Sequence, residues 1–432
     1  MRIRNLIRLL AGILSIAFVF MPSGGALASD DIGEPHTWTF GGHFKYQYID
    51  TWKPEDSLFQ RFSPNDLRDH NLEARLKLIG RHNRWDFKTD VQLIYVHSDT
   101  LAGSRSQSLP FSDSLGVIND DRRLFDLTHY FKNRNKDATV LRLDRANIGY
   151  MGDKTVIRVG RQAISWGNGL LFTPMDIFNP FNPTVVDKEY KTGDDMLYGQ
   201  YLMPNGSDFQ VVAVARRDQG KDKVEKNEAS LALKYHGFWG RSEYDFLLAG
   251  HYGQAVFGAG VSMDIGGAIW RGDLLWNDTD SGSVYTAVGG VSYSGIVAGH
   301  NWSGALEYYY NGFGIPDGVY SPSRILANPG LRARLSRGEL FNLGRHYLGA
   351  SMRLEASPLL SITPNIFVNL IDPSVLTQMV ISYDWKQNVQ LLAAINVPIG
   401  KNGTEYGGIR ALHPGQYVSI DVSFFAQFAW YF

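Results

Sequence analysis

Polar and apolar residues alternate along two neighbouring stretches near the start of the chain. The even positions from Leu72 to Leu78 are apolar, and the odd positions between them are charged. From Trp85 to Tyr95 the odd positions are apolar or β-branched, and the even positions begin with Asp86. A period of two places alternate side chains on opposite faces of a strand, so these stretches predict a hairpin with one apolar and one charged face.

Similar stretches recur to the end of the chain, and we predict about eighteen strands. Each is close to the length of a tilted membrane strand, about 9–11 residues plus its ends, and the count is even, as in bacterial single-chain barrels. In such a barrel the apolar face contacts lipid and the polar face lines water, whereas a soluble sandwich buries its apolar face. The predicted strands are residues 37–49, 68–81, 84–97, 139–151, 154–164, 192–204, 207–217, 226–238, 241–253, 256–265, 267–277, 284–294, 297–311, 344–356, 359–371, 374–385, 387–399 and 418–432.

The connections between these strands alternate between short and long. The short ones are His82-Asn83, Gly152-Asp153, Asn205-Gly206, Phe238-Trp239-Gly240, Gly266, Gly295 and Lys386, several of which have the residues of tight hairpin turns. The longer ones are residues 50–67, 98–138, 165–191, 312–343 and 400–417. Together they predict an all-β fold: a closed antiparallel transmembrane β-barrel of about eighteen strands, with short periplasmic turns and long extracellular loops.

The connection at residues 165–191 is unusually apolar for a loop. It has two glycines and three prolines, yet its side chains include Trp166, Leu170, Leu171, Phe172, Met175, Ile177, Phe178 and Phe181. Loops at a protein surface are normally polar, so we expect this one to fold back onto other parts of the chain. In a barrel the available place is the interior, and we predict that the loop enters the barrel and forms its constriction.

Charged residues on the polar faces of the predicted strands are the first candidates for function. They either form ion pairs that stiffen the wall or line a path whose fixed charges select solutes. By alternation the lumen-facing set includes Glu73, Arg75, Lys77, Asp86, Lys88, Asp90, Gln92, Arg142, Arg158, Arg353 and Glu355.

Arg161 does not fit this alternation, because it shares parity with Ile157 and Val159. An arginine facing lipid at the membrane centre costs about 2–4 kcal/mol. We therefore expect a bulge or strand end near Gly160, and a register slip in the neighbouring strand at Asp144-Arg145. The candidate constriction set is Arg142, Asp144, Arg145, Arg158, Arg161, Gln162, Trp166, Asn168, Asp176 and Asn179, with Arg158 favoured over Arg161. Asp144, Asp176 and Asp187 are the expected partners of Arg145, Arg158 and Arg161.

The last predicted strand has an unbroken apolar face that ends on Phe432. It resembles the C-terminal strand of bacterial outer-membrane barrels, which implies recognition by the barrel assembly machinery through Phe428, Trp430 and Phe432. The chain begins with three arginines, an apolar run from Leu9 to Phe20 and small residues up to Ala28. This pattern predicts a signal peptide at residues 1–28, cleaved after Ala28, followed by one barrel domain at 29–432 in the bacterial outer membrane; the run is too short for a retained spanning helix.

Composition narrows the possible chemistry. The absence of cysteine excludes disulfides, thiolate metal sites and cysteine nucleophiles. Loss of three arginines with the signal peptide takes the formal charge from −1 to −4, and no basic block indicates nucleic acid as a partner. No histidine cluster or haem-attachment motif is present, so we predict no metal or cofactor. We interpret the acidic pairs Asp120-Asp121 and Asp194-Asp195 as solvated turns.

Two further patterns have competing interpretations. His97, Ser98 and Asp99 have the residue types of a catalytic triad, but consecutive strand residues point to opposite faces, so we predict no enzymatic activity. The loop at 312–343 is rich in arginine, which indicates either a loop facing solvent and lipopolysaccharide or a basic vestibule that attracts anions. Its arginines are Arg324, Arg332, Arg334 and Arg337.

A short motif resembles one found in proteobacterial porin-like and alginate-export-like outer-membrane barrels. It consists of Arg158, Gly160, Arg161, Gln162, Trp166 and Gly167, followed by Asp176, Asn179 and Pro180. The resemblance implies a channel in contact with outer-membrane lipid. We expect a hydrophilic solute to pass by diffusion. The alternatives are an export pore for an anionic exopolysaccharide, assisted by periplasmic components, and a sheath around a multihaem cytochrome.

Overall fold

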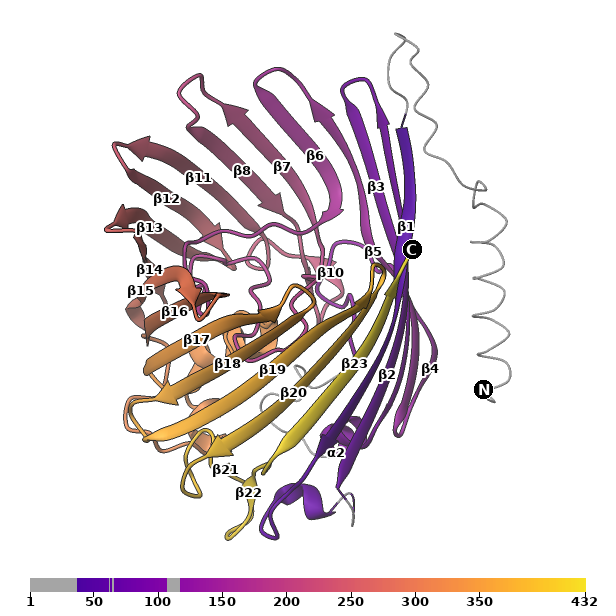
Figure 1. Cartoon of the computed structure of the whole chain (residues 1–432), viewed down its shortest axis with the longest axis vertical. Helices are drawn as coiled ribbons and strands as arrows, with labels where there is room; N and C mark the ends of the chain where they lie inside the picture. The colour runs from indigo at the N-terminus through magenta and orange to yellow at the C-terminus, as the bar shows by residue number, and fades with distance from the viewer. Residues whose placement is uncertain (1–36, 62, 64–65, 107–116) are drawn as a thin grey trace.

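The computed structural model describes residues 37–61, 63, 66–106 and 117–432. The predicted signal peptide lies outside the described residues. Within them the chain forms one large antiparallel sheet that closes on itself, because β1 pairs with both β2 and β23 (Figure 1). Closure leaves no free sheet edge, so neighbouring strands satisfy the backbone polar groups within the bilayer.

Eighteen of the nineteen strands in this sheet form the ring, each paired with its neighbour on both sides. They are β1 (Thr37–Thr51), β2 (Leu67–His82), β3 (Trp85–Ser98), β5 (Asp137–Met151), β6 (Thr155–Gln162), β7 (Asp194–Leu202), β8 (Asp208–Val214), β11 (Ser230–Trp239), β12 (Ser242–His251), β13 (Gln254–Ile265), β14 (Ala268–Thr279), β15 (Gly282–Val297), β16 (His300–Asn311), β17 (His346–Ser357), β18 (Leu360–Asn369), β19 (Ser374–Lys386), β20 (Val389–Ile399) and β23 (Ser423–Tyr431). The predicted fold class and strand count are therefore confirmed.

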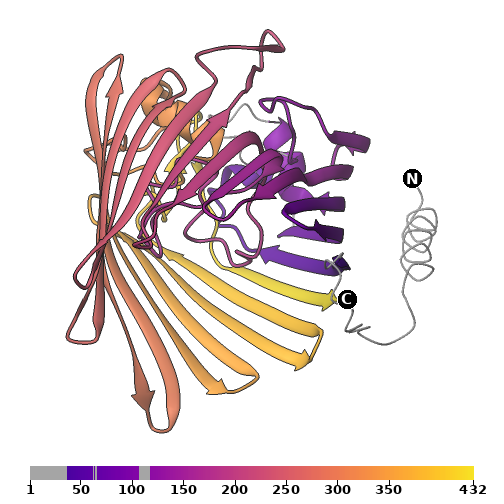
Figure 2. The same ribbon diagram turned by 90° about the horizontal axis from the view of Figure 1, so that it is seen from above.

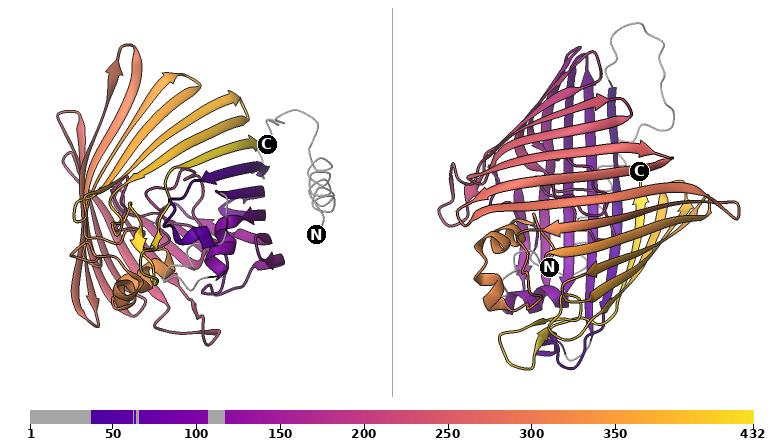
Figure 3. Two further views of the ribbon diagram at one scale, coloured as in Figure 1. Left: turned by 90° about the horizontal axis from the view of Figure 1, so that it is seen from below. Right: turned by 90° about the vertical axis from the view of Figure 1, so that its left-hand side faces the viewer.

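The remaining elements lie on the long connections. β4 (Thr128–Arg134) is the nineteenth strand of the sheet and pairs with β5. The other elements are a 3-10 helix, η1 (Leu58–Arg61), the helices α2 (Asp99–Ser106), α3 (Pro322–Leu326) and α4 (Pro329–Arg337), and two small ribbons. The ribbons are β9 (Arg217–Asp218) with β10 (Lys223–Val224), and β21 (Ile409–Arg410) with β22 (Tyr417–Val418). Figure 3 shows α3 and α4, in orange, at one rim of the barrel.

Side chains alternate across the wall as the sequence predicts. On β12, Phe246 and Leu248 are about half exposed on the outside, whereas Asp245 and Leu247, which alternate with them, are buried on the inside. An apolar exterior around a ring with no open edge is the arrangement required by a lipid bilayer. No helix in the described part of the chain is long and apolar enough to cross a membrane. The closed ring and its apolar exterior give the fold of a transmembrane β-barrel.

Three local predictions were wrong. The β15–β16 turn lies at Ala298-Gly299, whose positive φ angles of 50° and 81° suit a tight hairpin, and Gly295 lies within β15. The long connection predicted at 98–138 contains β4, whose seven residues are too short for alternation to distinguish them from a loop. The last barrel strand starts at Ser423, because Tyr417–Val418 pair with β21.

The two ends of the ring meet at a seam between β1 and β23. The Gly42 backbone N–H donates to the Phe432 carbonyl at 2.9 Å, and the Phe432 N–H donates to the Gly42 carbonyl at 3.1 Å. The Phe432 ring lies near Phe40 and Trp430, with centroid separations of 6.2 and 5.3 Å. The terminal aromatic residue therefore packs into the closure of the barrel; its recognition by assembly machinery stays a prediction.

Gly42→Ala is expected to weaken this seam. A Cβ at Gly42 would lie 2.1 Å from the backbone oxygen of Arg75 and 2.9 Å from the Phe432 ring. Overpacking of this kind costs about 1–3 kcal/mol, so the folded band in heat-modifiability electrophoresis should disappear at a lower temperature. Gly289→Ala is the matched control, because a Cβ at this strand glycine meets no atom within 4 Å. Equal melting of the two variants would contradict the prediction.

Candidate functional site

The connection between β6 and β7 lies inside the ring of strands (Figure 2). In its first half, Trp166, Phe172, Met175 and Phe178 are almost completely buried. Phe172 packs against Val288, Tyr309, Tyr347 and Phe367. The other three pack against inward-facing apolar side chains of the wall, which include Met196, Val212, Val214, Ala232, Leu247, Ala249, Val256 and Leu275. The loop is apolar because this half forms a hydrophobic core between itself and one side of the barrel.

Two buried carboxylates on the wall hold this half in place. Glu307 on β16 accepts the backbone N–H groups of Leu170, Leu171 and Phe172 at 2.5, 2.9 and 3.0 Å. Asp273 on β14 accepts two further N–H groups, at 2.8 and 3.3 Å, and the Asn168 side chain at 2.8 Å. Hydrogen bonds to a charged group contribute about 1.5–3 kcal/mol each, so these acids anchor an otherwise irregular backbone.

Aromatic and polar side chains complete the anchoring. Phe172 stacks on Tyr309 with a centroid separation of 4.9 Å and an interplanar angle of 12°. Trp166 donates its indole N–H to Gln210 at 2.8 Å. Asp176 pairs with Lys191 at the base of the loop; burial raises the pKa of Asp176 to about 7, although Lys191 opposes this shift.

The second half of the loop is polar and contacts the opposite side of the barrel. Lys45 on β1 pairs with Asp187 at 2.7 Å and with Glu189 at 2.6 Å. The Tyr190 ring lies beneath Arg75 and Lys77 of β2, both 4.3 Å from its centroid. These contacts hold the polar half near the wall without filling the space beside it.

That space is a cavity of about 450 Å³, the passage. Its wall side comes from β1, β2, β3, β5, β20 and β23, and its loop side from residues 184–187 and 190–192. An outer cavity of about 570 Å³, the vestibule, adjoins it beside residues 117–123 and 336–341. A third cavity of about 490 Å³, the chamber, faces β15–β19. Val185 lines all three, so the three cavities adjoin one another at this residue of the loop.

Ion pairs dominate the wall of the passage. Arg75 is the centre of this network, with Asp144 at 2.8 Å, Glu73 at 3.2 Å and Asp90 at 3.4 Å. Arg142 differs: its Nε and Nη2 atoms have no hydrogen-bond partner among the described residues, although its side chain is almost fully buried. The nearest carboxylate oxygens are 3.4 Å away on Asp144 and 3.7 Å away on Asp120. Arg142 therefore brings a cationic group with unused donors to the passage.

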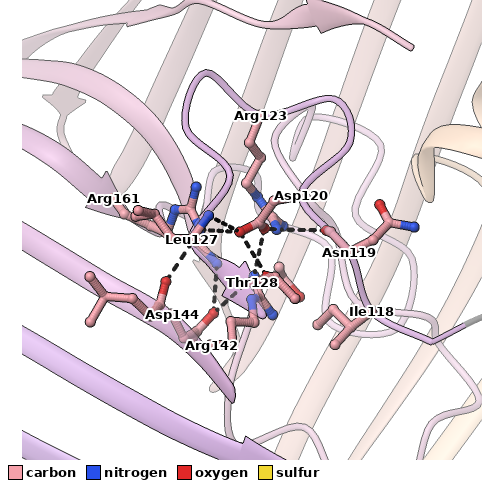
Figure 4. Close-up of polar contacts among 12 residues, drawn as sticks. Ile118, Asn119, Asp120, Arg123, Leu127, Thr128, Arg142, Asp144 and Arg161 are labelled. Atoms are coloured by element: carbon pink, nitrogen blue, oxygen red, sulfur yellow. Dashed lines mark hydrogen bonds and ion pairs between the residues drawn. The ribbon is translucent and has the colours of Figure 1, made fainter. Parts of the chain in front are cut away.

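Asp120 is the centre of a second polar cluster, shown in Figure 4. Its buried carboxylate accepts hydrogen bonds from Arg161 at 2.6 Å, the Leu127 N–H at 3.1 Å and the Thr128 hydroxyl at 2.8 Å, and it also pairs with Arg123. Burial raises the pKa of Asp120, but Arg123, Arg142 and Arg161 together lower it to about 2. The prediction that Asp120 lies in a solvated turn is therefore wrong.

This cluster closes an irregular part of the wall. β5 pairs with β6 over residues 146–151 and with β4 over 137–142, so the strip between these ranges lacks a strand on that side. Residues 118–127 fill it, with the Leu143 N–H donating to Leu127 at 3.0 Å. On the opposite side of β5, the pairing with β3 shifts register beside Asp144, which confirms the predicted slip.

Arg161 has the parity of the exposed Ile157 and Val159, yet only 1% of its surface is exposed. It follows Gly160, whose φ of 117° is accessible to glycine, and β6 ends one residue later. Besides Asp120, its guanidinium contacts both oxygens of Asp195 at 2.9 Å. Asp195 is therefore not a solvated turn, and neither is its buried neighbour Asp194, which pairs with Arg216 at 2.7 Å.

The structure does not support the predicted preference for Arg158 over Arg161 at the constriction, because neither lines the passage. Arg158 lies 3.4 Å from Asp86, and Arg161 is fixed in the wall; neither belongs to the lining of the passage as described. Their predicted partners were therefore wrong, whereas Arg145 does pair with Asp144, at 2.8 Å.

The other candidates divide between the wall, the loop and the rim. Gln162 donates to the Met196 carbonyl at 3.3 Å, and Asn179 takes a positive φ of 54° in the loop. Lys88 is partly exposed, while Arg353 and Glu355 are exposed toward the short-turn rim. Of the predicted set, those that line the passage are Glu73, Arg75, Gln92, Arg142 and Asp144; Lys45 and Tyr190 were missed.

The remaining patterns resolve into separate contacts. His97 bonds Asp137 at 2.7 Å, Ser98 accepts the Leu101 N–H at 2.8 Å, and Asp99 pairs with Lys136, so the three do not form a triad.

The arginine-rich loop is also more internal than expected. Arg334 is 6% exposed and lies 3.6 Å from the Phe313 ring centroid, and Arg337 lies 3.6 Å from that of Tyr252. These two arginines pack at the vestibule side of the loop, which corrects the interpretation of a loop turned wholly to solvent or lipopolysaccharide.

The ring, its apolar exterior and its inward loop define an outer-membrane β-barrel of porin-like fold. Among solved structures, OccAB4 of Acinetobacter baumannii is similar, with 9% identity, a TM-score of 0.53, and 93% of this chain and 99% of that chain covered. A BenF-like porin from Pseudomonas fluorescens has 10% identity and a TM-score of 0.50, with 92% and 98% covered.

Wzi of Escherichia coli is also similar, with 11% identity, a TM-score of 0.50, and 90% of this chain and 83% of that chain covered. It is described as an outer-membrane protein involved in group 1 capsule assembly and as a carbohydrate-binding β-barrel. At these identities the likeness concerns the fold alone. No family model and no curated protein matches the chain. The resemblance to alginate-export-like barrels stays a prediction.

Proposed function

We propose that the protein is a channel through which a small hydrophilic solute diffuses across the outer membrane. The observation that carries this proposal is that vestibule, passage and chamber all adjoin the loop at Val185. The anchored loop narrows the barrel but leaves a polar route on one side of it. Barrels of 16–18 strands enclose an aqueous lumen, and an inward loop reduces that lumen to a size at which side chains discriminate between solutes.

The two halves of the loop have different roles in this mechanism. The apolar half packs against the β7–β14 side and closes it to water. The polar half, with Asp187 and Tyr190, lines the passage together with Lys45, Arg75 and Arg142. A hydrated solute exchanges water for these fixed groups as it passes, and their closely paired charges keep the exchange reversible.

The alternatives differ in what the interior must contain. A cytochrome sheath needs a wide empty lumen, and the buried core formed by Trp166, Met175 and Phe178 disfavours it. Export of an anionic polysaccharide remains the second candidate, because the vestibule is lined by arginines, including Arg122, Arg123 and Arg337. A deletion strain with unchanged surface polysaccharide would contradict the export function.

The cysteine-free chain permits a direct test of the route. Purified protein in planar bilayers should conduct ions. Val185→Cys, modified with a bulky methanethiosulfonate, should lose most of its conductance, because Val185 is 39% exposed within the route. Val211→Cys is the matched control, since Val211 is 41% exposed on the lipid-facing side of β8. The absence of wild-type conductance, or an equal effect at both positions, would overturn the proposal.

A further inference from the structure

The chamber differs in charge from the other cavities of the route. The vestibule is lined by Asp121, Asp187 and Asp194 besides its arginines, and the passage contains three acids among its lining residues. The chamber contains Lys188 and Arg353 but no Asp or Glu in its described lining. Besides apolar residues of the loop and wall, the lining around the two cations contains neutral hydrogen-bonding side chains, including Ser292, Ser294, Ser303, Ser351, Thr363 and Asn365.

Neither cation is neutralised by a nearby acid. Lys188 donates to the Pro183 carbonyl at 2.9 Å, and neither it nor Arg353 forms an ion pair with any described carboxylate. Glu307 is the acid that acts on Lys188 electrostatically, but the two form no ion pair and the Glu307 oxygens accept three N–H groups of the loop. Lys45 in the passage, by contrast, contacts two carboxylates.

A third cation adds to this charge. Arg271 on β14 donates to the hydroxyl of Ser292, a chamber residue, at 2.5 Å, and it also lacks an ion pair among the described residues. Lys188 and Arg353 are exposed to the interior, so both are accessible to a solute. The chamber therefore combines uncompensated positive charge with a wall of hydroxyl and amide groups.

We propose that the chamber is a binding subsite for a phosphate monoester of a small hydroxylated molecule. A phosphate monoester carries close to two negative charges at neutral pH and presents several strong acceptor oxygens. Arg and Lys supply the charge-assisted hydrogen bonds that phosphate oxygens accept. The serine, threonine and asparagine side chains match the hydroxyl groups of the rest of the molecule.

The location gives the subsite its role. Arg353 lies on β17 between the buried Tyr347 and the short turn at residues 358–359, so the chamber is on the periplasmic side of the loop. Val185 and Val186 line both chamber and passage. A solute leaving the passage therefore reaches the cations directly, which draw it forward. This role rests on the proposed function, whereas binding to the chamber is measurable without transport.

Equilibrium binding to the detergent-solubilised full chain tests the subsite, with glucose 6-phosphate, gluconate and glucose as separate ligands in calorimetric titrations. Glucose 6-phosphate should bind most tightly and glucose least. These two ligands have similar hydroxyl groups, but only glucose 6-phosphate carries the negative charge that the cations attract. Lys188→Gln with Arg353→Gln should weaken glucose 6-phosphate binding at least tenfold. Lys401→Gln, which removes one positive charge from an exposed loop, is the control and should bind like wild type.

Three results would overturn the proposal. Binding of gluconate as tight as that of glucose 6-phosphate would refute the phosphate class, and equal binding of all three ligands would refute recognition of the anion. Unchanged binding by the double variant, shown to be folded by heat-modifiable migration, would refute the location. Failure of the channel function is a separate outcome, seen as absent wild-type current in bilayers while binding persists.

Discussion

Replacing Glu307 by Gln and Asp273 by Asn together is expected to raise the single-channel conductance severalfold. The two carboxylates accept five backbone N–H groups of the inward loop, from Asn168 to Phe172. Each charge-assisted bond contributes about 1.5–3 kcal/mol. A neutral amide forms weaker hydrogen bonds, and its NH₂ group is itself a donor that cannot accept the backbone N–H groups it faces. The first half of the loop then leaves its fixed position, and the lumen approaches that of an open barrel of this size.

A matched double variant separates loop release from a simple change of charge. Glu355→Gln with Asp384→Asn removes the same number of carboxylates from exposed sites on β17 and β19, where each accepts one bond from a neighbouring side chain. Its conductance should remain within about a factor of two of wild type, a tolerance that corresponds to about 0.4 kcal/mol. Planar-bilayer recordings at high salt measure both variants. Equal conductance of the anchor variant and wild type would show that the loop is held by its apolar core alone.

The sequence predicts the barrel well because lipid imposes one rule on every strand. Alternation from Leu72 to Leu78 or along β12 reflects which side chains meet lipid, and this requirement does not depend on the rest of the fold. Local exceptions follow from contacts that alternation does not contain. The β15–β16 turn lies at Ala298-Gly299, and not at Gly295, because both of these residues adopt positive φ. β4 was missed because seven residues give too little alternation to recognise.

The site was harder to predict because its contacts join residues distant in sequence. The apolar composition indicated that residues 165–191 turn inward, but not that Glu307 and Asp273 would hold them. The sequence did contain a signal for these two acids. Each lies on an inward strand face two residues before an apolar or aromatic residue, Tyr309 after Glu307 and Leu275 after Asp273. Parity favoured Arg158 over Arg161, because it describes a regular strand and Arg161 lies where residues 118–127 replace one. Asp120 appeared to be part of a turn, since its partner Arg161 is 41 residues away in the sequence.

Asp120→Ala is expected to destabilise the barrel by about 3 kcal/mol. Removing one member of a buried ion pair leaves the other charge without compensation, which costs about 3–5 kcal/mol. The lower value applies because Arg161 retains Asp195. Urea unfolding monitored by tryptophan fluorescence measures the loss. Asp126→Ala is the control, since Asp126 lies in the same segment, is exposed and accepts a hydrogen bond from the Thr128 N–H.

The pH dependence tests whether charge is the cause. The pKa of Asp120 is lowered to about 2, from an ordinary value of 3.8. A depressed carboxyl pKa stabilises the fold above the unfolded-state value and ceases to do so as pH falls through the folded-state value. The difference in unfolding free energy between wild type and Asp120→Ala should therefore be constant from pH 7 to about 5 and shrink by about 2 kcal/mol between pH 4 and 2. Asp120→Asn keeps an acceptor oxygen for Leu127 and Thr128 but not the charge, so it should lose most of the same stability at pH 7. If Asp120→Asn instead keeps its stability, as Asp126→Ala should, then the hydrogen bonds, and not the arginines, hold residues 118–127 in the wall.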